Sequence, residues 1–488
     1  MKTISGEEFK IKILSKLKSF NDLTINIENE IILQTQSLNI ELTFKNIIFK
    51  GDSLIFHDRD PEAPFNRFCI FENCTFLCNI HFSSSTFKYL KFISCKIKNQ
   101  FFQITSCKIK NLSFEENNEK INEILPTIVE SGYLKISDGK IETIDFENII
   151  FNNGSLSISN LNQTKSFSIT RSTLNTVIFS HCTFNDYFHY IGNKVVLNSN
   201  NFFFNHCNFP IFAFFETKLN NSTHFHHCTF SSSATFQSIE NEINGELKFT
   251  TCDFNKFTDF DKSKIHKLRI EKTKFYDLVS FQETYFDIIE IDKTNFEKGA
   301  FFDDIQIKKI DNCDRRTIRT IKQELQKKEN KIDFNRFRVY EFNAYRKDIR
   351  KKLAEFKKDK NRFHHRKREP IQLKRDLFIL NISDIASEYG TDWKRAIKFT
   401  LLSGFAAFTL FFILENFKLN IDLNDWQDFV YSYFRFFLIT DFKNEYYEAG
   451  ERVLKFNSII SLFPFIIGKI AIAFGIYEMI QSFRKFKA

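Results

Sequence analysis

Histidine and cysteine stand next to each other at three places in this sequence, and both residue types are common zinc ligands. The pairs are His181–Cys182, His206–Cys207 and His227–Cys228, the last preceded by His226. Neighbouring side chains of an extended chain point to opposite faces, so one pair cannot readily place both ligands on the same ion. Two explanations stay open, a metal column and stacked polar side chains on a surface, and we favour the second. We predict no metal site and no cofactor.

A single lysine, Lys469, lies inside a long apolar stretch at residues 456–477. An ionisable group at membrane depth is costly to bury, so it is a functional candidate. Lys469 either faces a pore or an oligomer interface, where its charge would favour anions or gate cations, or its alkyl chain reaches back to the membrane surface. Arg435 and Asp441, in the preceding segment, are further pore or gating candidates, with interfacial anchoring as the alternative.

Common catalytic signatures are missing from the sequence. It contains none of the strings GxxxxGK[ST], GxGxxG, HExxH, GxSxG and CxxC, which mark phosphate-binding loops, zinc proteases, hydrolases and redox sites. The sequence also shows no acid, base and nucleophile in an arrangement typical of a catalytic site. We therefore expect an architectural or membrane-borne protein that is not an enzyme.

Charge is unevenly distributed along the 488 residues. Residues 314–376 contain 23 Lys or Arg against 10 Asp or Glu, whereas the formal net charge of the whole chain is +9. Attraction to anionic lipid headgroups explains this basic band best. A solvated helix face and nucleic-acid binding are the weaker alternatives, and we expect no nucleic-acid partner.

All ten cysteines lie at or before Cys313, and most stand at a fixed offset between two large apolar residues. This placement predicts small buried side chains that stay free thiols in a reducing compartment. The first 20 residues have no uninterrupted apolar core of the kind that a secretory signal needs. We therefore expect residues 1–313 to be cytosolic.

A short unit, Φ-x-x-[C/S/T]-x-Φ with Φ a large apolar residue, recurs between residues 71 and 296. Clear examples are Phe71–Cys74–Phe76, Phe204–Cys207–Phe209 and Phe281–Thr284–Phe286. In one run the last apolar residues stand at 254, 265, 275, 286 and 296, so two units make a period of 21 residues. Apolar residues five apart with a small residue between them do not fit a helix. The pattern predicts a tightly wound β-solenoid whose stacked Phe side chains form the core.

These units resemble the pentapeptide-repeat family, in which a central Leu or Phe is preceded two positions earlier by a small residue. Cys74 before Phe76 and Thr294 before Phe296 match that offset, and the resemblance covers residues 40–313 with insertions near 115–134 and 187–201. The resemblance implies a right-handed quadrilateral β-helix that serves as a structural or protein-binding surface.

Helical apolar spacing replaces the repeat after Cys313. It predicts basic amphipathic helices that end by Pro370, because helix is disfavoured before a proline. Two apolar stretches, 396–414 and 456–477, are each long enough to cross a bilayer. We therefore predict a mainly β fold with a β-helix at 1–313, a basic amphipathic helical linker at 314–395 and a two-span transmembrane hairpin at 396–488.

Basic residues flank both apolar stretches. Lys394 and Arg395 precede the first, and Arg484 and Lys485 follow the second, so all four are membrane-surface candidates. The intervening loop carries more acids than bases, and by the positive-inside rule both termini are cytoplasmic. We predict a multi-pass protein of the cell inner (cytoplasmic) membrane, with the lipid bilayer as a partner.

Residues 426–442 are aromatic but too short and too charged to span, which predicts an interfacial or re-entrant segment. The order helix, re-entrant segment, helix resembles the C-terminal module of bacterial pentapeptide-repeat membrane proteins that look like relatives of ion channels. The potassium-filter string TVGYG is absent, and residues 437–441 read FLITD.

Two functions therefore remain open. In the first, the chain is a homo-oligomeric pore-forming or ion-channel-like subunit with a cytoplasmic β-helical sensing or assembly domain. In the second, it is a membrane-anchored scaffold whose β-helix binds a cytosolic protein partner. The two differ in whether Lys469 and residues 426–442 face water.

Overall fold

The computed structural model describes residues 1–15, 17–34, 41–58, 67–98, 100–116, 125–191, 201–219, 221–241, 244–358, 368–415, 425–440 and 459–484. The chain divides into two compact units, Met1–Thr320 and Ile321–Ala488. Each unit has its own architecture.

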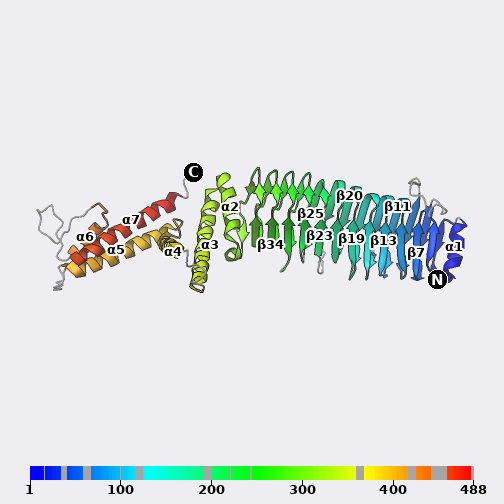
Figure 1. The fold of residues 1–488 in the computed structure, drawn as a ribbon, viewed down its shortest axis with the longest axis horizontal. Helices are drawn as coiled ribbons and strands as arrows, with labels where there is room; N and C mark the ends of the chain where they lie inside the picture. Colours follow the sequence, from blue (N-terminus) through cyan, green and yellow to red (C-terminus); the bar gives the residue numbers. More distant parts are fainter. Residues whose placement is uncertain are drawn as a thin grey trace. The chain divides into compact units, whose positions relative to one another are not determined.

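The first unit is a β-solenoid of about 12 turns, and Figure 1 shows its strands stacked one behind another from helix α1 (Gly6–Leu14) onward. Strands of successive turns pair in parallel and form three sheets. The first sheet contains β1 (Lys2–Ser5), β3 (Leu23–Ile27), β6 (Ile48–Gly51), β9 (Thr75–Phe76), β12 (Lys96–Ile97), β15 (Thr127–Val129) and β18 (Ile149–Phe151).

The second sheet runs along most of the unit. It contains β4 (Ile31–Gln34), β7 (Ser53–His57), β10 (Asn79–Ser83), β13 (Phe101–Thr105), β16 (Tyr133–Ser137), β19 (Ser155–Ser159), β21 (Thr176–Ser180), β23 (Asn201–Asn205), β26 (Lys218–Leu219), β27 (Thr223–His226), β30 (Glu240–Asn241), β31 (Glu246–Thr250), β34 (Lys264–Glu271), β37 (Tyr285–Asp292) and β40 (Gln306–Ile307).

The third sheet also follows the whole stack. It contains β2 (Ser19–Asn21), β5 (Glu41–Lys45), β8 (Phe68–Glu72), β11 (Thr86–Ile93), β14 (Lys108–Glu115), β17 (Lys140–Glu147), β20 (Asn162–Thr170), β22 (Thr183–Ile191), β24 (Asn208–Phe209), β25 (Ile211–Phe215), β28 (Thr229–Phe230), β29 (Ala234–Thr235), β32 (Asp253–Phe254), β33 (Thr258–Asp259), β35 (Lys274–Phe275), β36 (Val279–Ser280), β38 (Asn295–Phe296) and β39 (Ala300–Phe301).

Phenylalanine fills the centre of the solenoid. Phe254, Phe275 and Phe296 are partners in the register of neighbouring strands, as their spacing of 21 residues predicts. Their ring centroids are 4.6 and 5.2 Å apart, close to the distance between neighbouring strands. Each turn therefore stacks its aromatic rings on those of the next, and the predicted β-solenoid is confirmed. Its handedness and quadrilateral cross-section stay predictions.

The small residue of the repeat fits the core and also donates a hydrogen bond to buried backbone carbonyl groups. Ser85 Oγ donates to Phe56 O of the previous turn at 3.1 Å and to Ser83 O at 3.0 Å. Cys74 Sγ lies 3.3 Å from Phe44 O and 3.4 Å from Glu72 O in the same arrangement. Buried carbonyl groups need partners. Cys, Ser and Thr are interchangeable here because all three are small and carry a donor.

The residue before this small residue turns the chain. The backbone angle φ is near +50° at Asn73, Ser84, Ser94 and Ser106. Residues other than glycine rarely adopt this left-handed conformation. The same conformation recurs once or more in almost every later turn, for example at Lys272 (φ 51°). The repeat is therefore a backbone turn followed by an inward donor, which the side-chain pattern alone does not reveal.

The ten cysteines are all free and buried. Burial raises the pKa of Cys78 and of Cys107 to about 12 in each case. These thiols therefore stay protonated near neutral pH and act as small core side chains with a weak donor.

Helices make up the described part of the second unit. They are α3 (Lys331–Lys358), α4 (Arg368–Ser387), α5 (Trp393–Glu415), α6 (Asp425–Phe436), the 3-10 turn η4 (Ile459–Ser461) and α7 (Leu462–Arg484). The 3-10 turn η2 (Ile310–Asn312) and helix α2 (Arg315–Lys327) lie at the boundary between the two units.

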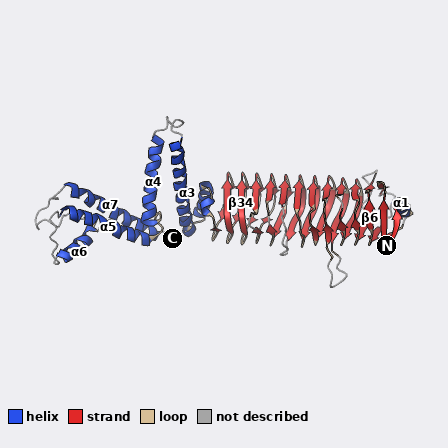
Figure 2. Ribbon diagram, turned by 90° about the horizontal axis from the view of Figure 1, so that it is seen from below, coloured by secondary structure: helices blue, strands red, loops and turns tan. Residues whose placement is uncertain are grey.

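Helices α3 and α4 form an antiparallel hairpin, and Figure 2 shows them side by side. Its core holds Val339, Ile349, Leu373, Leu380 and Tyr389. The expectation that helix is disfavoured at Glu369 was wrong, because Glu369 and Pro370 both lie in the first turn of α4. A proline is tolerated there, since the first N–H groups of a helix have no partner within the helix.

Candidate functional site

Helices α5 and α7 are long and apolar enough to cross a membrane. In a soluble core helix most of the apolar surface would be covered. Here only 22% of the apolar window in Trp393–Leu414 and 39% of that in Ile459–Arg484 is buried. Side chains such as Leu402 (58% exposed) and Ile470 (63% exposed) point outward. The chain thus has the features of a membrane-anchored protein carrying a β-solenoid.

The second span differs from the stretch predicted at 456–477. The described helix begins at Leu462 and continues to Arg484, and residues 456–458 lie outside the described residues. Pro464 falls in the first turn of α7 and does not interrupt it. Beyond Tyr477 the last turns of α7 contact α4 through Glu478 and Ser387, and α5 through Phe483 and Trp393.

Small residues bring α5 and α7 together as an antiparallel pair. A Cβ at Gly475 would lie 2.1 Å from Thr400 Oγ1, and one at Gly468 would lie 2.7 Å from the Cβ of Ala407. Close backbone approach through glycine is a common way for spanning helices to associate, because lipid provides no hydrophobic drive between them. The pair is therefore fixed in depth, with Thr400 beside Gly475 and Ala407 beside Gly468.

Helix α6 ends level with the middle of this pair. Tyr433 Oη donates to Leu401 O at 3.1 Å, and the Phe437 ring lies against Gly404. The Phe436 ring packs on Phe408, with centroids 5.5 Å apart. Non-helical backbone follows, from Phe437 to Thr440. The segment predicted to be interfacial or re-entrant therefore contains a short helix that stops against the two apolar helices.

Lys469 lies at the end of α6 and is only 5% exposed. Its Nζ donates to Phe436 O and to Leu438 O, both at 2.8 Å. It also lies 4.9 Å from the centroid of the Phe436 ring and 5.4 Å from that of Phe465. The last carbonyl groups of a helix lack partners in the helix and carry partial negative charge. Lys469 thus supplies both hydrogen bonds and charge to the C-terminus of α6.

The other predicted candidates lie near helix ends or outside the described residues. Arg435 is half-buried in the last turn of α6. Asp441 and Lys485 lie outside the described residues. Lys394 and Arg395 are exposed in the first turn of α5, and Arg484 is exposed at the last residue of α7.

Stacking of Trp393 on Phe483, with centroids 5.8 Å apart, brings these two helix ends together. Asp392 Oδ1 accepts from Lys394 N at 2.9 Å and from Arg395 N at 3.2 Å, so it caps α5. Lys394, Arg395 and Arg484 consequently share one end of the helix pair, which we call the basic end. An aromatic residue beside basic side chains is typical of a membrane–water boundary.

A buried polar cluster at the basic end was not predicted. Ser387 Oγ donates to Glu478 Oε2, and Gly390 N donates to Ser387 Oγ at 2.7 Å. Glu478 is 7% exposed and Ser387 is fully buried. Arg338 Nη2 donates to Tyr389 O at 2.9 Å, and burial lowers the pKa of Arg338 while Glu478 opposes that shift. The cluster ties α3, the α4–α5 turn and α7 to one another.

A sequence signal for this cluster exists in hindsight. Glu478, Gln481 and Ser482 are polar residues three and four apart at the end of an apolar helix, where one face must meet a polar partner. Gly390, with φ of +77°, follows Ser387 at a spacing typical of a helix end.

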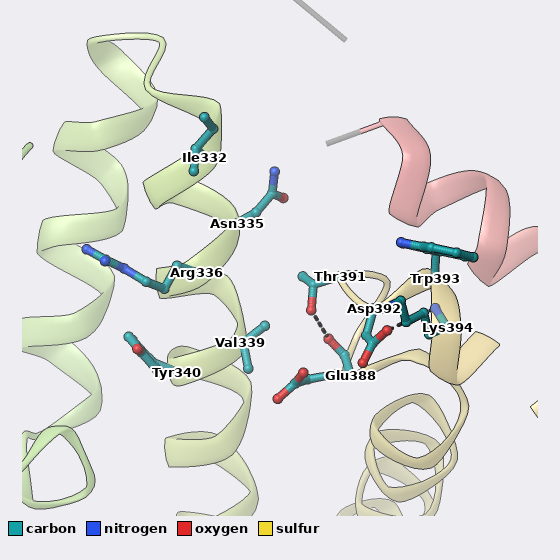
Figure 3. A pocket seen from close by; sticks show the side chains of 10 residues that line it. All are labelled: Ile332, Asn335, Arg336, Val339, Tyr340, Glu388, Thr391, Asp392, Trp393 and Lys394. Atoms are coloured by element: carbon teal, nitrogen blue, oxygen red, sulfur yellow. Dashed lines mark hydrogen bonds between the residues drawn. The ribbon is translucent and has the colours of Figure 1, made fainter. Parts of the chain in front are cut away.

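A cleft of about 570 Å³ opens beside this turn, between α3 and the start of α5 (Figure 3). Arg336 and Tyr340 project from α3, whereas Glu388, Asp392 and Lys394 come from the turn and α5. Thr391 Oγ1 donates to Glu388 O at 2.8 Å and stabilises the turn that forms one wall. The cleft therefore presents charges of both signs at the basic end.

Three histidines of the solenoid form a column at its surface. His206 stacks on His181 at 5.0 Å and on His227 at 4.8 Å between centroids, and all three have φ between +51° and +54°. Their cysteine neighbours point inward. Over the described ranges, no group of three or more His, Cys, Asp or Glu could hold a metal ion.

Comparison with known proteins provides no family for this chain. No protein-family model, no curated protein and no solved structure matches it. The resemblance to pentapeptide repeats therefore rests on the repeat itself.

Proposed function

We propose that this chain is a pore-forming subunit of a homo-oligomeric membrane channel, with the β-solenoid as a non-catalytic cytoplasmic sensing or assembly domain. One observation carries the proposal: α6 stops between α5 and α7, and its last carbonyl groups are held by Lys469. Non-helical backbone at membrane depth is stable only where protein covers it or water lines it. A simple anchor would need neither the half-helix nor a buried lysine.

The oligomer follows from the same geometry. One pair of spans with one re-entrant helix cannot enclose a water-filled path, so several copies must surround it. Exposed apolar side chains on α5 and α7, among them Leu402 and Ile466, give surface for lipid and for neighbouring copies. In this proposal Lys469 supports the wall of the pore from behind and does not itself contact the ions.

The orientation of the protein is part of the proposal. Lys394, Arg395 and Arg484 gather at one end, which the positive-inside rule assigns to the cytoplasm. The solenoid and both termini would then lie on the cytoplasmic side of the inner membrane. Burial of ten free cysteines in the solenoid agrees with a reducing compartment.

Ion flux through proteoliposomes that contain the full chain tests the proposal. Lys469→Met would leave two carbonyl groups of α6 without their donor, and we expect flux to be lost. Lys398→Met is the matched control, because Lys398 is exposed near the basic end of α5 and caps nothing in α6. A chain ending at Asp392 provides the blank.

The outcomes separate the two functions. Flux in the wild type and in Lys398→Met, with none in Lys469→Met, supports a pore. Absence of flux in correctly inserted wild-type protein over a range of salts, voltages and lipids contradicts it.

The second candidate is a membrane-anchored scaffold, and a groove on the solenoid favours it. This groove, of about 560 Å³, is lined by Ile178, Phe203 and His224 on neighbouring strands. Ile178 and Phe203 are 39% and 37% exposed, and polar side chains such as Asn205 and His226 line the groove beside them. If no flux is seen, this groove is where a cytosolic protein partner would be sought, by testing Phe203→Asp in binding experiments.

A further inference from the structure

Helix α4 has two different faces, of which only one is covered. Leu373, Leu377 and Leu380 pack against α3. Two acidic side chains share that face, since Tyr345 Oη donates to Asp376 Oδ2 at 3.2 Å and Arg346 forms an ion pair with Asp384. The acids in the middle of α4 are therefore turned toward α3.

The opposite face of α4 is apolar and uncovered within the described chain. Its side chains and their exposed fractions are Ile371 (54%), Phe378 (65%), Ile379 (63%) and Ile385 (68%). At ~100° per residue this face lies roughly 150° around the helix from the leucines that contact α3. Lys374 is exposed at one edge of this face, and Arg375 is exposed between Ile371 and Ile379. The outer face thus combines large apolar residues with basic ones.

This face lies on the side of the spans. In Figure 2, α4 runs across the direction of α5 and α7, with α3 against one side and the spans leaving from the other. The bond between Ser387 and Glu478 holds the end of α4 at the basic end of α7. Along α5 the exposed apolar surface continues through Leu401, Leu402 and Phe405. Helix α4 thus ends at the basic end, and the exposed apolar surface of α5 begins about two turns further along α5.

We propose that α4 lies in the headgroup layer of the cytoplasmic leaflet, with Ile371, Phe378, Ile379 and Ile385 inserted into lipid. An amphipathic helix with bases beside its apolar face binds an anionic membrane surface in this way. A second copy of the chain is a poorer partner, because it would bring Lys374 and Arg375 of both copies together. The inference rests on α5 and α7 crossing a bilayer and is independent of whether a pore forms.

Site-directed spin labelling of the full chain in anionic lipid vesicles tests this inference. A nitroxide at Phe378→Cys should be accessible to oxygen and protected from a water-soluble nickel chelate, at a depth of ~5–10 Å below the headgroup boundary. Ile379→Cys repeats the test if the first variant folds poorly. Ala354→Cys, exposed on α3, should show the reverse order of accessibility. Wild-type protein is the labelling blank, since its thiols are buried.

A further label at Leu402→Cys separates this inference from the proposed function. Lipid exposure at 402 with full nickel access at 378 would overturn the placement of α4 and leave the spans intact. Spin–spin broadening at 378 that disappears on dilution with unlabelled protein would also overturn it, in favour of contact between copies.

The charge requirement is tested with the double variant Lys374→Gln/Arg375→Gln. We expect the label at 378 to move toward water in this variant. We expect the same shift when Lys374 and Arg375 are kept and anionic lipid is replaced by zwitterionic lipid. An unchanged depth in both would overturn the assignment to an anionic surface.

Discussion

The solenoid and the helix pair α5–α7 solve opposite burial problems. In the solenoid, Phe225 and its equivalents are fully buried and the exposed positions are mostly polar. In the helix pair, Ile467 and Ile470 are exposed, whereas Lys469 and Glu478 are buried. Both buried charged groups have hydrogen-bond partners, as groups removed from water require. The same chain is therefore built for two different surroundings.

The largest effect should come from the aromatic stack. Phe225 lies 4.5 Å from Phe204 and 5.0 Å from Phe249 between centroids. We expect Phe225→Ala to lower the free energy of unfolding by about 3–5 kcal/mol, because the turns on both sides lose a contact. Urea denaturation of the detergent-solubilised chain, followed by the β-sheet circular dichroism signal, measures it. Phe203→Ala is the control and should stay within about 0.5 kcal/mol, since Phe203 points outward. Equal losses of unfolding free energy in the two variants would contradict the distinction between buried and outward-facing phenylalanines.

The next effect concerns the contact between the spans. Gly475→Leu places a side chain where Thr400 lies, so we expect α5 and α7 to separate at a cost of about 1–3 kcal/mol. Hydrogen exchange of the α5 and α7 amides in nanodiscs should become faster. Ile470→Phe enlarges an exposed side chain of the same helix and should leave exchange unchanged. Similar exchange in the two variants would mean that the helices do not pack through glycine.

A comparable or smaller effect is expected at the inward donor of the repeat. Ser263 Oγ donates to Phe236 O at 2.9 Å and accepts from Ile239 N at 3.1 Å. Ser263→Ala leaves these buried groups without that partner and should cost about 1–3 kcal/mol. Ser263→Cys retains a donor and should cost less, as the exchange of Ser for Cys among the natural repeats indicates. Urea denaturation compares the unfolding free energies of the two variants. If Ser263→Ala is as stable as Ser263→Cys, only the size of the side chain matters at this position.

The smallest effect should be the response of the solenoid to pH. Burial lowers the pKa of His81, His189, His224 and His226. A lowered pKa favours the neutral form in the folded state, so stability is full above the unfolded value of about 6.5 and falls as the pH drops through the folded values. Thermal unfolding at pH 7.5, 6.0 and 5.0 should show a decreasing midpoint. His226→Gln should reduce the slope, and a midpoint that rises on acidification would contradict the sign.

The solenoid was predictable because its signal is local and repeated. Two Phe and one small residue at fixed offsets recur often enough to reveal the period and the inward face. The left-handed residue before each small side chain was not predictable, because Asn, Ser, His, Lys and Glu all occupy that place. Its conformation is imposed by the stacked turns and not by its own preference.

The helical unit was predictable in outline only. Length and composition reveal the two spans, and Trp426 begins a segment that is evidently different from both. The partner of Lys469 could not be found, because it is a pair of backbone carbonyl groups more than thirty residues earlier. Backbone groups leave no trace in a pattern of side chains. The same holds for Arg338, whose acceptor is Tyr389 O.

The register of the phenylalanine stack also bears on how such a chain can change over generations. Equivalent places in successive turns are occupied by Phe254, Phe275 and Phe296. A duplication or loss of 21 codons therefore joins one turn to another and keeps the stacking of Phe on Phe in the core. Each such event lengthens or shortens the stack by ~4.8 Å. Recombination between neighbouring repeats can therefore set the reach of this domain in even steps, while the membrane part is left untouched.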